Sequence, residues 1–241
     1  KFAHNDGEDL ERLIVKFQSE ATHLYVATES VFSMDGDSPN LEELALICDK
    51  FGCHLIVDEA HALGVFGNQG NGLVAQLKLQ DRVFARVVTF GKGLGCHGAA
   101  ILGSDGLKSY LVNFARSFIY TTGLSPHTLA NILTAYAHLK ADQTAIEKLR
   151  GNIVHFNQQK NLLGLKPMFV YSKSAIQCAI IPGNDKVKSI ALKLQEKGYD
   201  VKPILAPTVP EGQERLRICL HSYNSENEIS GLLEALGQLI F

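Results

Sequence analysis

A lysine held between glycines is the first feature of this 241-residue chain that could do chemistry. Lys92 follows the apolar, β-branched run of residues 87–90, which predicts a buried strand, and it lies among the glycines of residues 91–98. Glycine lets the backbone take positive φ and lets another group come close to it. We expect Lys92 to be desolvated at this strand end, where its amine could form a Schiff base with a carbonyl cofactor.

Three other interpretations of this stretch lead to different chemistry or to none. A phosphate-binding P-loop is excluded, because Arg86 stands where the motif needs its first glycine and Gly93 where it needs Ser or Thr. Residues 93–98 match the dinucleotide pattern G-x-G-x-x-G, but that pattern opens a helix, whereas residues 99–103 have the pattern of a short strand. A glycine-rich hairpin with a solvated lysine is the third alternative, and it stays open at this point.

Further polar groups follow other predicted strands. Ser33 follows the apolar run 24–28, Asp58 and His61 follow the run 54–57, and Thr89 closes the run before Lys92. Each has a structural explanation of its own, such as a loop cap, a core histidine or a β-forming residue. Because ligands of open α/β sheets gather beyond the carboxyl ends of the strands, their recurrence at successive strand ends favours a common site.

Two further interpretations of the residues around Asp58, a helicase motif and a metal site, are not supported. The run Asp58-Glu59-Ala60-His61 also spells a helicase box, but no Walker lysine precedes it to hold ATP phosphates. Asp58 and His61 have no third metal ligand at suitable spacing, so a metal site is not expected.

Composition narrows the class of protein. With 46% hydrophobic and 20% charged residues and a formal net charge of −2, the chain resembles an average soluble protein without a nucleic-acid surface. No apolar stretch approaches the roughly 18 residues of a membrane span, and no signal peptide opens the chain. The five scattered cysteines predict free thiols in the cytoplasm, not a zinc site. Because the chain begins with Lys1 and enters a helical pattern at once, we expect it to be the C-terminal part of a longer protein.

The elements that must position these residues alternate between strand and helix. Strands are predicted at 24–28, 54–58, 83–90, 99–102 and 118–121, and helices at 9–17, 41–51 and 129–149. This alternation predicts an α/β fold with a mostly parallel sheet covered on both faces, in which residues 99–102 run antiparallel. After a long helix the pattern changes, with strands or extended segments at 175–181, 199–204 and 215–220 and helices at 187–197 and 229–239. We therefore divide the chain into residues 1–145, part of a large domain, and residues 146–241, a small C-terminal α/β domain.

Five segments give the chain a family resemblance: residues 29–37 (ESVFSMDGD), 57–67 (VDEAHALGVFG), 89–100 (TFGKGLGCHGAA), 114–122 (FARSFIYTT) and 207–220 (PTVPEGQERLRICL). In these the chain resembles the α-oxoamine synthases, pyridoxal 5′-phosphate (PLP) enzymes of fold type I that condense an amino acid with an acyl-CoA and release CO₂. The resemblance covers essentially the whole chain. It implies the fold type I architecture, a PLP cofactor and a homodimer.

The resemblance also implies roles for individual residues. Lys92 would be the Schiff-base lysine, Asp58 would pair with the pyridine nitrogen of PLP, and His61 would bond its O3′ oxygen. Ser33 and Thr89 would lie near the ring substituents and the phosphate, and Thr122 would reach a phosphate in the partner subunit. In the small domain, Thr208 and Arg217 would hold the substrate, Arg217 through a bidentate contact with the amino-acid carboxylate.

Within the family, the motifs TFGKG (residues 89–93) and GAA (residues 98–100) favour a member that condenses L-alanine with pimeloyl-CoA or a pimeloyl carrier protein in biotin synthesis. A relative that uses glycine or serine, and a catalytically silent partner subunit, are the alternatives. The family has a further N-terminal stretch with the main phosphate-binding loop and the residue that stacks on the PLP ring. Because this chain begins after that stretch, we expect it to be inactive alone.

Overall fold

The computed structural model describes residues 1–241, which form two compact units. Unit 1 comprises Lys1–Val31 and Ser38–Asp142, and unit 2 comprises Phe32–Asp37 and Gln143–Phe241. The predicted boundary between residues 145 and 146 lies close to the change after Asp142. The sequence pattern did not indicate that the loop Phe32–Asp37 packs with the second unit.

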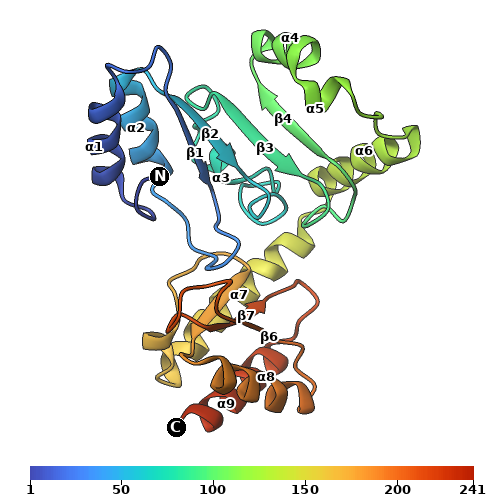
Figure 1. Ribbon diagram of the computed structural model, residues 1–241. Helices are drawn as coiled ribbons and strands as arrows, with labels where there is room; N and C mark the ends of the chain where they lie inside the picture. Colours follow the sequence, from blue (N-terminus) through green and yellow to red (C-terminus); the bar gives the residue numbers. More distant parts are fainter. The chain divides into compact units, whose positions relative to one another are not determined.

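Unit 1 is built on a four-stranded sheet in the order β1 (Tyr25–Glu29), β2 (His54–Asp58), β3 (Ala85–Thr89) and β4 (Ala99–Gly103) (Figure 1). The first three strands are parallel, and β4 runs antiparallel to β3. The prediction of a mostly parallel sheet with one antiparallel strand is confirmed. β4 lies directly after β3 because the glycine-rich turn between them is too short for a crossover helix.

Helices α1 (Gly7–Phe17) and α2 (Leu41–Phe51) cover one face of this sheet, on the left in Figure 1. Val26, Leu55 and Val57 point from β1 and β2 into the core that these helices complete. α2 begins at the cap residue Asn40 and ends at Gly52, whose φ of +67° gives the left-handed C-cap that the sequence predicted.

The other face of the sheet is only partly covered. A groove of about 540 Å³ runs between this face and α4 (Asp105–Phe114), and Tyr25, Ile56, Val87 and Ile101 are among the residues that line it. Tyr25 is 56% exposed and Ile101 is 53% exposed. The expectation of a sheet covered on both faces is therefore wrong for this chain, because α4 is the one helix that lines the groove.

Two predicted elements in the second half of unit 1 are wrong. Residues 118–121 form no strand, because Arg116–Ile119 is the short helix α5, in which the Tyr120 N–H donates to the Arg116 carbonyl at 3.0 Å. The helix predicted at 129–149 is divided into α6 (Pro126–Ala141) and α7 (Thr144–Leu162). Asp142 breaks it by taking an extended conformation, with φ −133° and ψ +116°.

Unit 2 contains a three-stranded antiparallel sheet in the order β5 (Ile176–Ile180), β7 (Arg215–Cys219) and β6 (Lys202–Ile204). Helix α9 (Glu226–Ile240) packs against α7 and α8 (Asn184–Glu196), as Figure 1 shows at the red end of the chain. α9 begins with a capping box between Ser225 and Glu228. The short α3 (Leu73–Gln76) of unit 1 and the 3₁₀ helix Lys166–Met168 of unit 2 complete the elements. None of the helices combines the length and apolar character that a membrane crossing requires.

Candidate active site

The carboxyl ends of β2 and β3 bring Asp58 and Thr89 to the same edge of the sheet in unit 1. Asp58 is the last residue of β2 and lies opposite Val87, so Thr89 is two residues further along the neighbouring strand. His61 and Lys92 follow in the turns that leave these strands. The four residues therefore lie where an open α/β sheet places its ligand.

A close backbone contact joins the turn that carries Lys92 to the turn that follows His61. A Cβ atom on Gly93 would lie 2.3 Å from the Leu63 carbonyl oxygen and 3.3 Å from the Gly64 Cα atom. Only glycine fits this approach, since real Cβ atoms do not come so near to backbone oxygens. The Lys92 turn is closed by a 3.0 Å hydrogen bond from the Gly95 N–H to the Lys92 carbonyl. Glycine at position 93 thus brings the lysine turn and the histidine turn together.

Hydrogen bonds hold Asp58 in one orientation. Its Oδ1 atom accepts the Ala60 N–H at 2.7 Å, and its carbonyl oxygen accepts the N–H and the hydroxyl of buried Ser30 at 2.8 and 3.2 Å. The side chain is half-buried at the strand end. A carboxylate fixed in this way can face a cationic partner without first losing conformational freedom.

A buried ion pair beside Asp58 was missed by the sequence analysis, which used Arg86 only to exclude a P-loop. Glu59 is fully buried, and its carboxylate accepts the Val74 N–H at 2.9 Å and the Arg86 Nε–H at 2.8 Å. Arg86 also donates to the Asn71 carbonyl at 2.9 Å. The pair ties the turn after β2 to β3 and to the loop before α3. No sequence signal shows that Glu59 and Arg86 meet, because only the β2–β3 register brings them together.

Thr89 has an unsatisfied hydroxyl group. Its Oγ1 atom is buried and has no hydrogen-bond partner. A buried polar atom without a partner costs free energy, on the order of 1–3 kcal/mol, unless a ligand or water bonds it. A phosphate or phenolate oxygen would satisfy this hydroxyl, and the donor set around it fits the cofactor that the sequence predicts.

Lys92 itself is exposed, so the expectation of a desolvated lysine is wrong for this chain. The side chain leaves from a turn beyond the last residue of β3, and its neighbours Gly91 and Gly93 are exposed as well. Thr122 is also exposed, in the segment between α5 and α6. That segment approaches the glycine-rich stretch where a Cβ on Gly98 would lie 2.9 Å from a methyl carbon of Leu124.

Ser33 and Arg217 are brought together within unit 2. The Arg217 Nε–H donates to the Ser33 carbonyl at 2.9 Å, and its Nη1 lies 3.1 Å from the Cys219 sulfur. Thr208 is exposed in the turn after β6, and no described contact joins it to Arg217. The predicted site residues are thus divided, with Asp58, His61, Thr89, Lys92 and Thr122 in unit 1 and the other three in unit 2.

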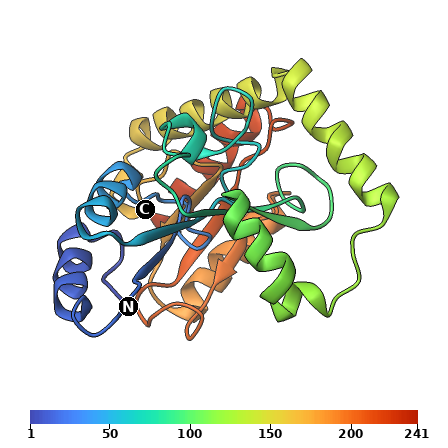
Figure 2. The ribbon, with the colours of Figure 1, turned by 90° about the horizontal axis from the view of Figure 1, so that it is seen from above.

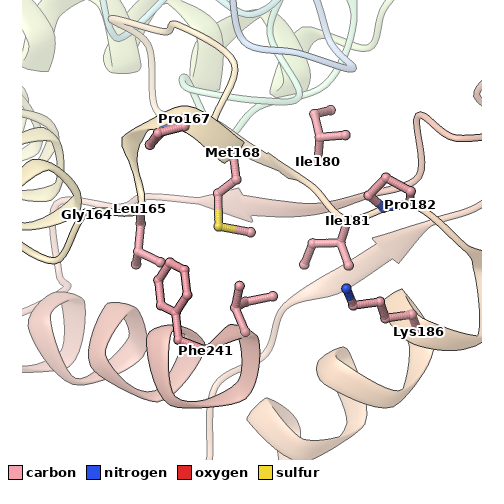
Figure 3. Close-up of a pocket in the computed structure, with 10 residues that line it drawn as sticks. Gly164, Leu165, Pro167, Met168, Ile180, Ile181, Pro182, Lys186 and Phe241 are labelled. Carbon is pink, nitrogen blue, oxygen red and sulfur yellow. The ribbon is translucent and has the colours of Figure 1, made fainter.

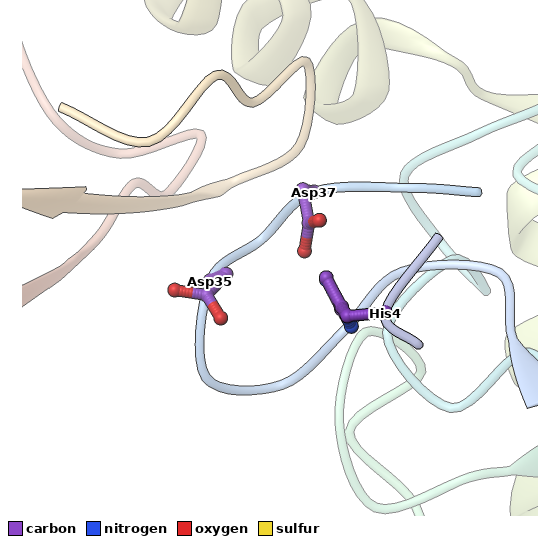
Figure 4. A group of neighbouring side chains, drawn as sticks. All are labelled: His4, Asp35 and Asp37. Carbon is purple, nitrogen blue, oxygen red and sulfur yellow. The ribbon is translucent and has the colours of Figure 1, made fainter. Parts of the chain in front are cut away.

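Several contacts with the unit 2 sheet anchor the loop Phe32–Asp37, which carries Ser33. Asp35, drawn in Figure 4, forms an ion pair with the mostly buried Arg215. The hydroxyls of Ser172 and Ser174 donate to the Gly36 carbonyl at 2.8 and 2.9 Å. A side chain at Gly36, whose φ is +73°, would collide with the Ile176 carbonyl at 2.2 Å. The loop position is therefore set by β5 and β7.

The five cysteines are all free, as predicted. Burial raises the pKa of Cys178 to about 12, so this thiol stays protonated. Its Sγ–H donates to the Met34 carbonyl at 2.9 Å and adds one more anchor to the loop. Burial likewise raises the pKa of Cys48 in unit 1 to about 12.

A cavity in unit 2 contains none of the predicted site residues. It has a volume of about 350 Å³ and mostly apolar walls, and Leu165, Met168, Ile181, Lys186 and Phe241 are among the residues that line it (Figure 3). The polar groups that the sequence predicts for cofactor and substrate binding therefore lie elsewhere. They lie at the strand ends of unit 1 and at the Ser33–Arg217 contact.

The class of protein follows from this fold and these strand-end residues. Residues 1–236 match the aminotransferase class I and II family, and the chain belongs to that family. The architecture is that of fold type I PLP-dependent transferases, as the sequence predicted.

Curated relatives narrow the resemblance. The chain is 39% identical to the 8-amino-7-oxononanoate synthase of Emericella nidulans over 98% of its own length and 61% of that protein. It is 40% identical to the synthase of the same name from Sodalis glossinidius, over 98% of this chain and 59% of that protein. The family resemblance stated from the motifs is confirmed. The chain spans about 60% of the length of the relatives it matches.

Solved structures agree with this placement. A structure of SPT (serine palmitoyltransferase) with PLP superposes on this chain with a TM-score of 0.90 and 25% identity. The match covers 99% of this chain and 60% of the SPT chain. The 8-amino-7-oxononanoate synthase of Francisella tularensis has a TM-score of 0.79 and 29% identity, and covers 95% of this chain and 66% of that chain.

Proposed function

We propose that this chain is part of a PLP-dependent acyltransferase that makes 8-amino-7-oxononanoate for biotin synthesis. Its substrates would be L-alanine and a pimeloyl thioester, either pimeloyl-CoA or a pimeloyl carrier protein. Similarity to synthases of this name along the whole chain supports the reaction. The observation that supports a PLP cofactor is the cluster of Asp58, His61, Thr89 and Lys92 on adjoining strand ends and turns.

The cluster residues have distinct tasks in this proposal. When bound, PLP supplies an electron sink for the carbanion that an amino acid leaves on losing a proton or CO₂. Lys92 holds the aldehyde carbon of the cofactor through its amine, and Asp58 keeps the proton on the pyridine nitrogen. His61 donates to the O3′ oxygen. The orphaned Thr89 hydroxyl and Ser33 bind oxygens of the ring substituents or the phosphate.

Arg217 and Thr208 hold the substrate amino acid. Since the Nε atom of Arg217 already donates to the Ser33 carbonyl, the side chain is oriented before substrate arrives. One N–H of Nη1 points to the Cys219 sulfur, so the second N–H of Nη1 and the Nη2 group remain to bind a carboxylate. A guanidinium matches the two carboxylate oxygens in geometry. A preset orientation reduces the entropy lost on binding.

The proposal includes a cytoplasmic homodimer in which Thr122 reaches a phosphate bound by the partner subunit. The five free cysteines fit a reducing compartment. The net charge of −2 gives no support to a nucleic-acid partner, and no membrane partner is proposed.

A second candidate is a synthase of the same family that uses glycine or serine. The likeness to an SPT structure, with a TM-score of 0.90, favours it, although the identity of 25% is lower than that of the curated relatives. A catalytically silent subunit is a third candidate. The presence of Lys92 opposes it, since a subunit without catalysis has no need of an imine-forming lysine.

Product formation tests the reaction in a hybrid protein. This chain would replace the matching 61% of the Emericella nidulans synthase, to which it is 39% identical. The purified hybrid is then supplied with PLP, with alanine, glycine or serine, and with acyl thioesters of different chain length. We expect product from alanine and the pimeloyl thioester. Turnover with serine and a long-chain thioester alone would support the second candidate instead.

Borohydride reduction tests the lysine. PLP is added to the hybrid, the protein is reduced, and the labelled peptides are identified by mass spectrometry. We expect the label on Lys92, its loss in Lys92→Ala, and its retention in the matched variant Lys108→Ala, which removes an exposed lysine of α4 in the same unit. A label that persists on other residues in Lys92→Ala would overturn the assignment.

A further inference from the structure

Glu59, directly after β2, is bonded to two other elements of unit 1. Its side chain is fully buried, its Oε1 atom accepts the Val74 N–H of α3 at 2.9 Å, and its Oε2 atom accepts the Arg86 Nε–H of β3 at 2.8 Å. The side chain of Arg86 is itself only 13% exposed. The described residues alone bury this ion pair, so its surroundings do not depend on a further segment or subunit.

A glycine makes room for the Glu59 carboxylate. A Cβ atom on Gly72 would lie 2.6 Å from the Oε2 atom of Glu59 and 2.7 Å from its Oε1 atom, closer than real Cβ atoms come. Helix α3, teal in Figures 1 and 2, follows Gly72 and packs through Leu73 and Val74 into the core that β2 also lines. The carboxylate therefore ties the end of β2 to a helix that the core fixes in place.

The backbone of Glu59 shapes the turn that carries His61. The Glu59 N–H donates to the Val87 carbonyl at 2.8 Å, which extends the pairing of β2 with β3 by one residue. The Glu59 carbonyl accepts the N–H groups of Ala62 and Leu63 at 3.0 and 3.1 Å. Because His61 lies between Glu59 and the residues that bond to its carbonyl, the orientation of Glu59 sets the path of the histidine turn.

The same turn fixes two further residues of the candidate site. Asp58 directly precedes Glu59, and its Oδ1 atom accepts a backbone N–H within the turn at 2.7 Å. At the end of the turn, the Leu63 carbonyl oxygen meets Gly93, where a Cβ atom would lie only 2.3 Å away. Gly93 directly follows Lys92. Glu59 is therefore linked to Asp58 through the chain and to Lys92 through one backbone contact.

The ion pair also distinguishes the charges of two neighbouring carboxylates. Asp58 and Glu59 are adjacent in the chain, and like charges so close together repel each other. Arg86 donates to the Glu59 carboxylate and, at 2.9 Å, to the Asn71 carbonyl. No described ion pair involves Asp58. Arg86 thus neutralises Glu59, and the negative charge of Asp58 stays available for a cationic partner.

We propose that Glu59 and Arg86 are positioning residues of the cofactor site. They hold Asp58, His61 and Lys92 in the arrangement that PLP binding requires. This inference rests on the proposed function, because it takes PLP as the cofactor. If the pair served stability alone, a variant that lowers stability elsewhere in unit 1 would weaken PLP binding equally.

Hydrogen exchange of the 241-residue chain tests the local role without any cofactor. Glu59→Gln keeps the shape of the side chain, but it exchanges an acceptor oxygen for an NH₂ donor and leaves Arg86 without a counter-charge. We expect the Ala62 and Leu63 amides to exchange at least about tenfold faster. Leu10→Ala removes a buried side chain of α1, and should speed exchange in α1 and α2 but not in the turn. Unchanged exchange in the turn of Glu59→Gln would overturn the proposal.

Titration of the hybrid synthase with PLP tests the effect on the cofactor. We expect Glu59→Gln to raise the dissociation constant of PLP at least about tenfold and to lower the borohydride label on Lys92. Leu10→Ala should leave both unchanged in the folded protein. Equal affinity of Glu59→Gln and the unaltered hybrid would overturn this inference alone. An unaltered hybrid that does not bind PLP at Lys92 would overturn the proposed function, and the inference with it.

Two variants of the arginine test the ion pair independently of Glu59→Gln. Arg86→Lys keeps the positive charge beside Glu59, although a single ammonium group cannot reproduce every contact of the guanidinium. Arg86→Gln removes the charge. We expect the PLP affinity of the hybrid to fall less in Arg86→Lys than in Arg86→Gln, and circular dichroism checks that both variants are folded. Equal losses in the two variants, or no loss in either, would show that the ion pair does not position the site.

Discussion

The side chain of Asp58 has both a structural role and a proposed role in cofactor binding. Its Oδ1 atom closes the turn after β2 through the Ala60 N–H, and its negative charge is what the proposed cofactor contact needs. The amide of asparagine can replace the first task, because its oxygen also accepts a hydrogen bond. It cannot replace the charge.

We therefore expect Asp58→Asn to fold and to lose most of its turnover in the hybrid synthase. Without the carboxylate the pyridine nitrogen loses its proton, and the cofactor becomes a poor electron sink. The fall in kcat should exceed about tenfold, or about 1.4 kcal/mol of barrier. Asp81→Asn, at an exposed aspartate of the same unit, is the control and should leave kcat unchanged. A loss below tenfold in Asp58→Asn would contradict the assigned role.

Lys160 shows what burial costs a charged residue that lies away from the site. It is 4% exposed, lies 5.1 Å from the Phe169 ring centroid, and has one hydrogen bond, of 3.4 Å, to Gln177 Oε1. Desolvation by burial, and then the nearby charge of Lys166, lower the pKa of Lys160. A lysine whose pKa falls on folding binds fewer protons in the native state, so stability rises as pH climbs from the folded pKa to the unfolded value.

Lys160→Met should raise the free energy of unfolding at neutral pH by about 1 kcal/mol, because it removes a buried charge and keeps the volume. This advantage should shrink as the pH approaches the ordinary lysine pKa of 10.5, since the native protein then holds a neutral Lys160. Urea unfolding followed by circular dichroism measures both effects. An advantage that stays constant or grows with pH would show that the lysine charge is not the cause.

At the scale of elements, the turn between β3 and β4 positions Lys92 by close packing. Gly93 meets the Leu63 carbonyl, whereas a Cβ on Gly91 would have ordinary contact, 3.6 Å from the Cys96 carbonyl. Neither glycine has a positive φ, so the two positions differ mainly in space.

This difference predicts unequal effects of two alanine substitutions on either side of the lysine. Gly93→Ala must push the two turns apart, and should cost about 1–3 kcal/mol of stability and reduce the PLP label on Lys92. Gly91→Ala should change neither by much. Thermal unfolding and borohydride labelling of the hybrid measure the two effects. Equal behaviour of the two variants would mean that the contact with Leu63 does not place the lysine.

At the scale of the whole molecule, the predicted site residues belong to two compact units, and the chain spans about 60% of its relatives' length. Lys92 is exposed and Thr89 lacks a partner, so the described residues hold only part of a cofactor's surroundings. A phosphate gains much of its binding energy from backbone N–H groups at a helix N-terminus.

We expect the 241-residue chain alone to bind PLP weakly. Titration with PLP, followed by the visible absorbance of the lysine adduct and by equilibrium dialysis, measures the affinity. Lys92→Ala separates specific binding from reaction with surface lysines. Stoichiometric binding with micromolar affinity that is lost in Lys92→Ala would show that the residues of this chain suffice.

Local pattern in the sequence determined most elements and the family. The apolar run 54–57, the cap Gly52 and the glycines around Lys92 each act over a few residues, so β2, the end of α2 and the lysine turn could be predicted. The motif residues Asp58, His61, Thr89 and Lys92 lie at neighbouring strand ends because parallel strands end at a common edge.

Tertiary structure alone decided which distant residues meet. The pairing of Glu59 with Arg86 depends on strand register. The contact of Ser33 with Arg217 depends on the loop Phe32–Asp37, which belongs to unit 2 although it is distant in sequence from the rest of that unit. Residues 118–121 were predicted as a strand because their side chains are apolar and aromatic. They form the end of α5 and a turn, since no neighbouring strand pairs with them. A strand needs partners along its length, and whether partners are present is a property of the folded molecule, not of the segment.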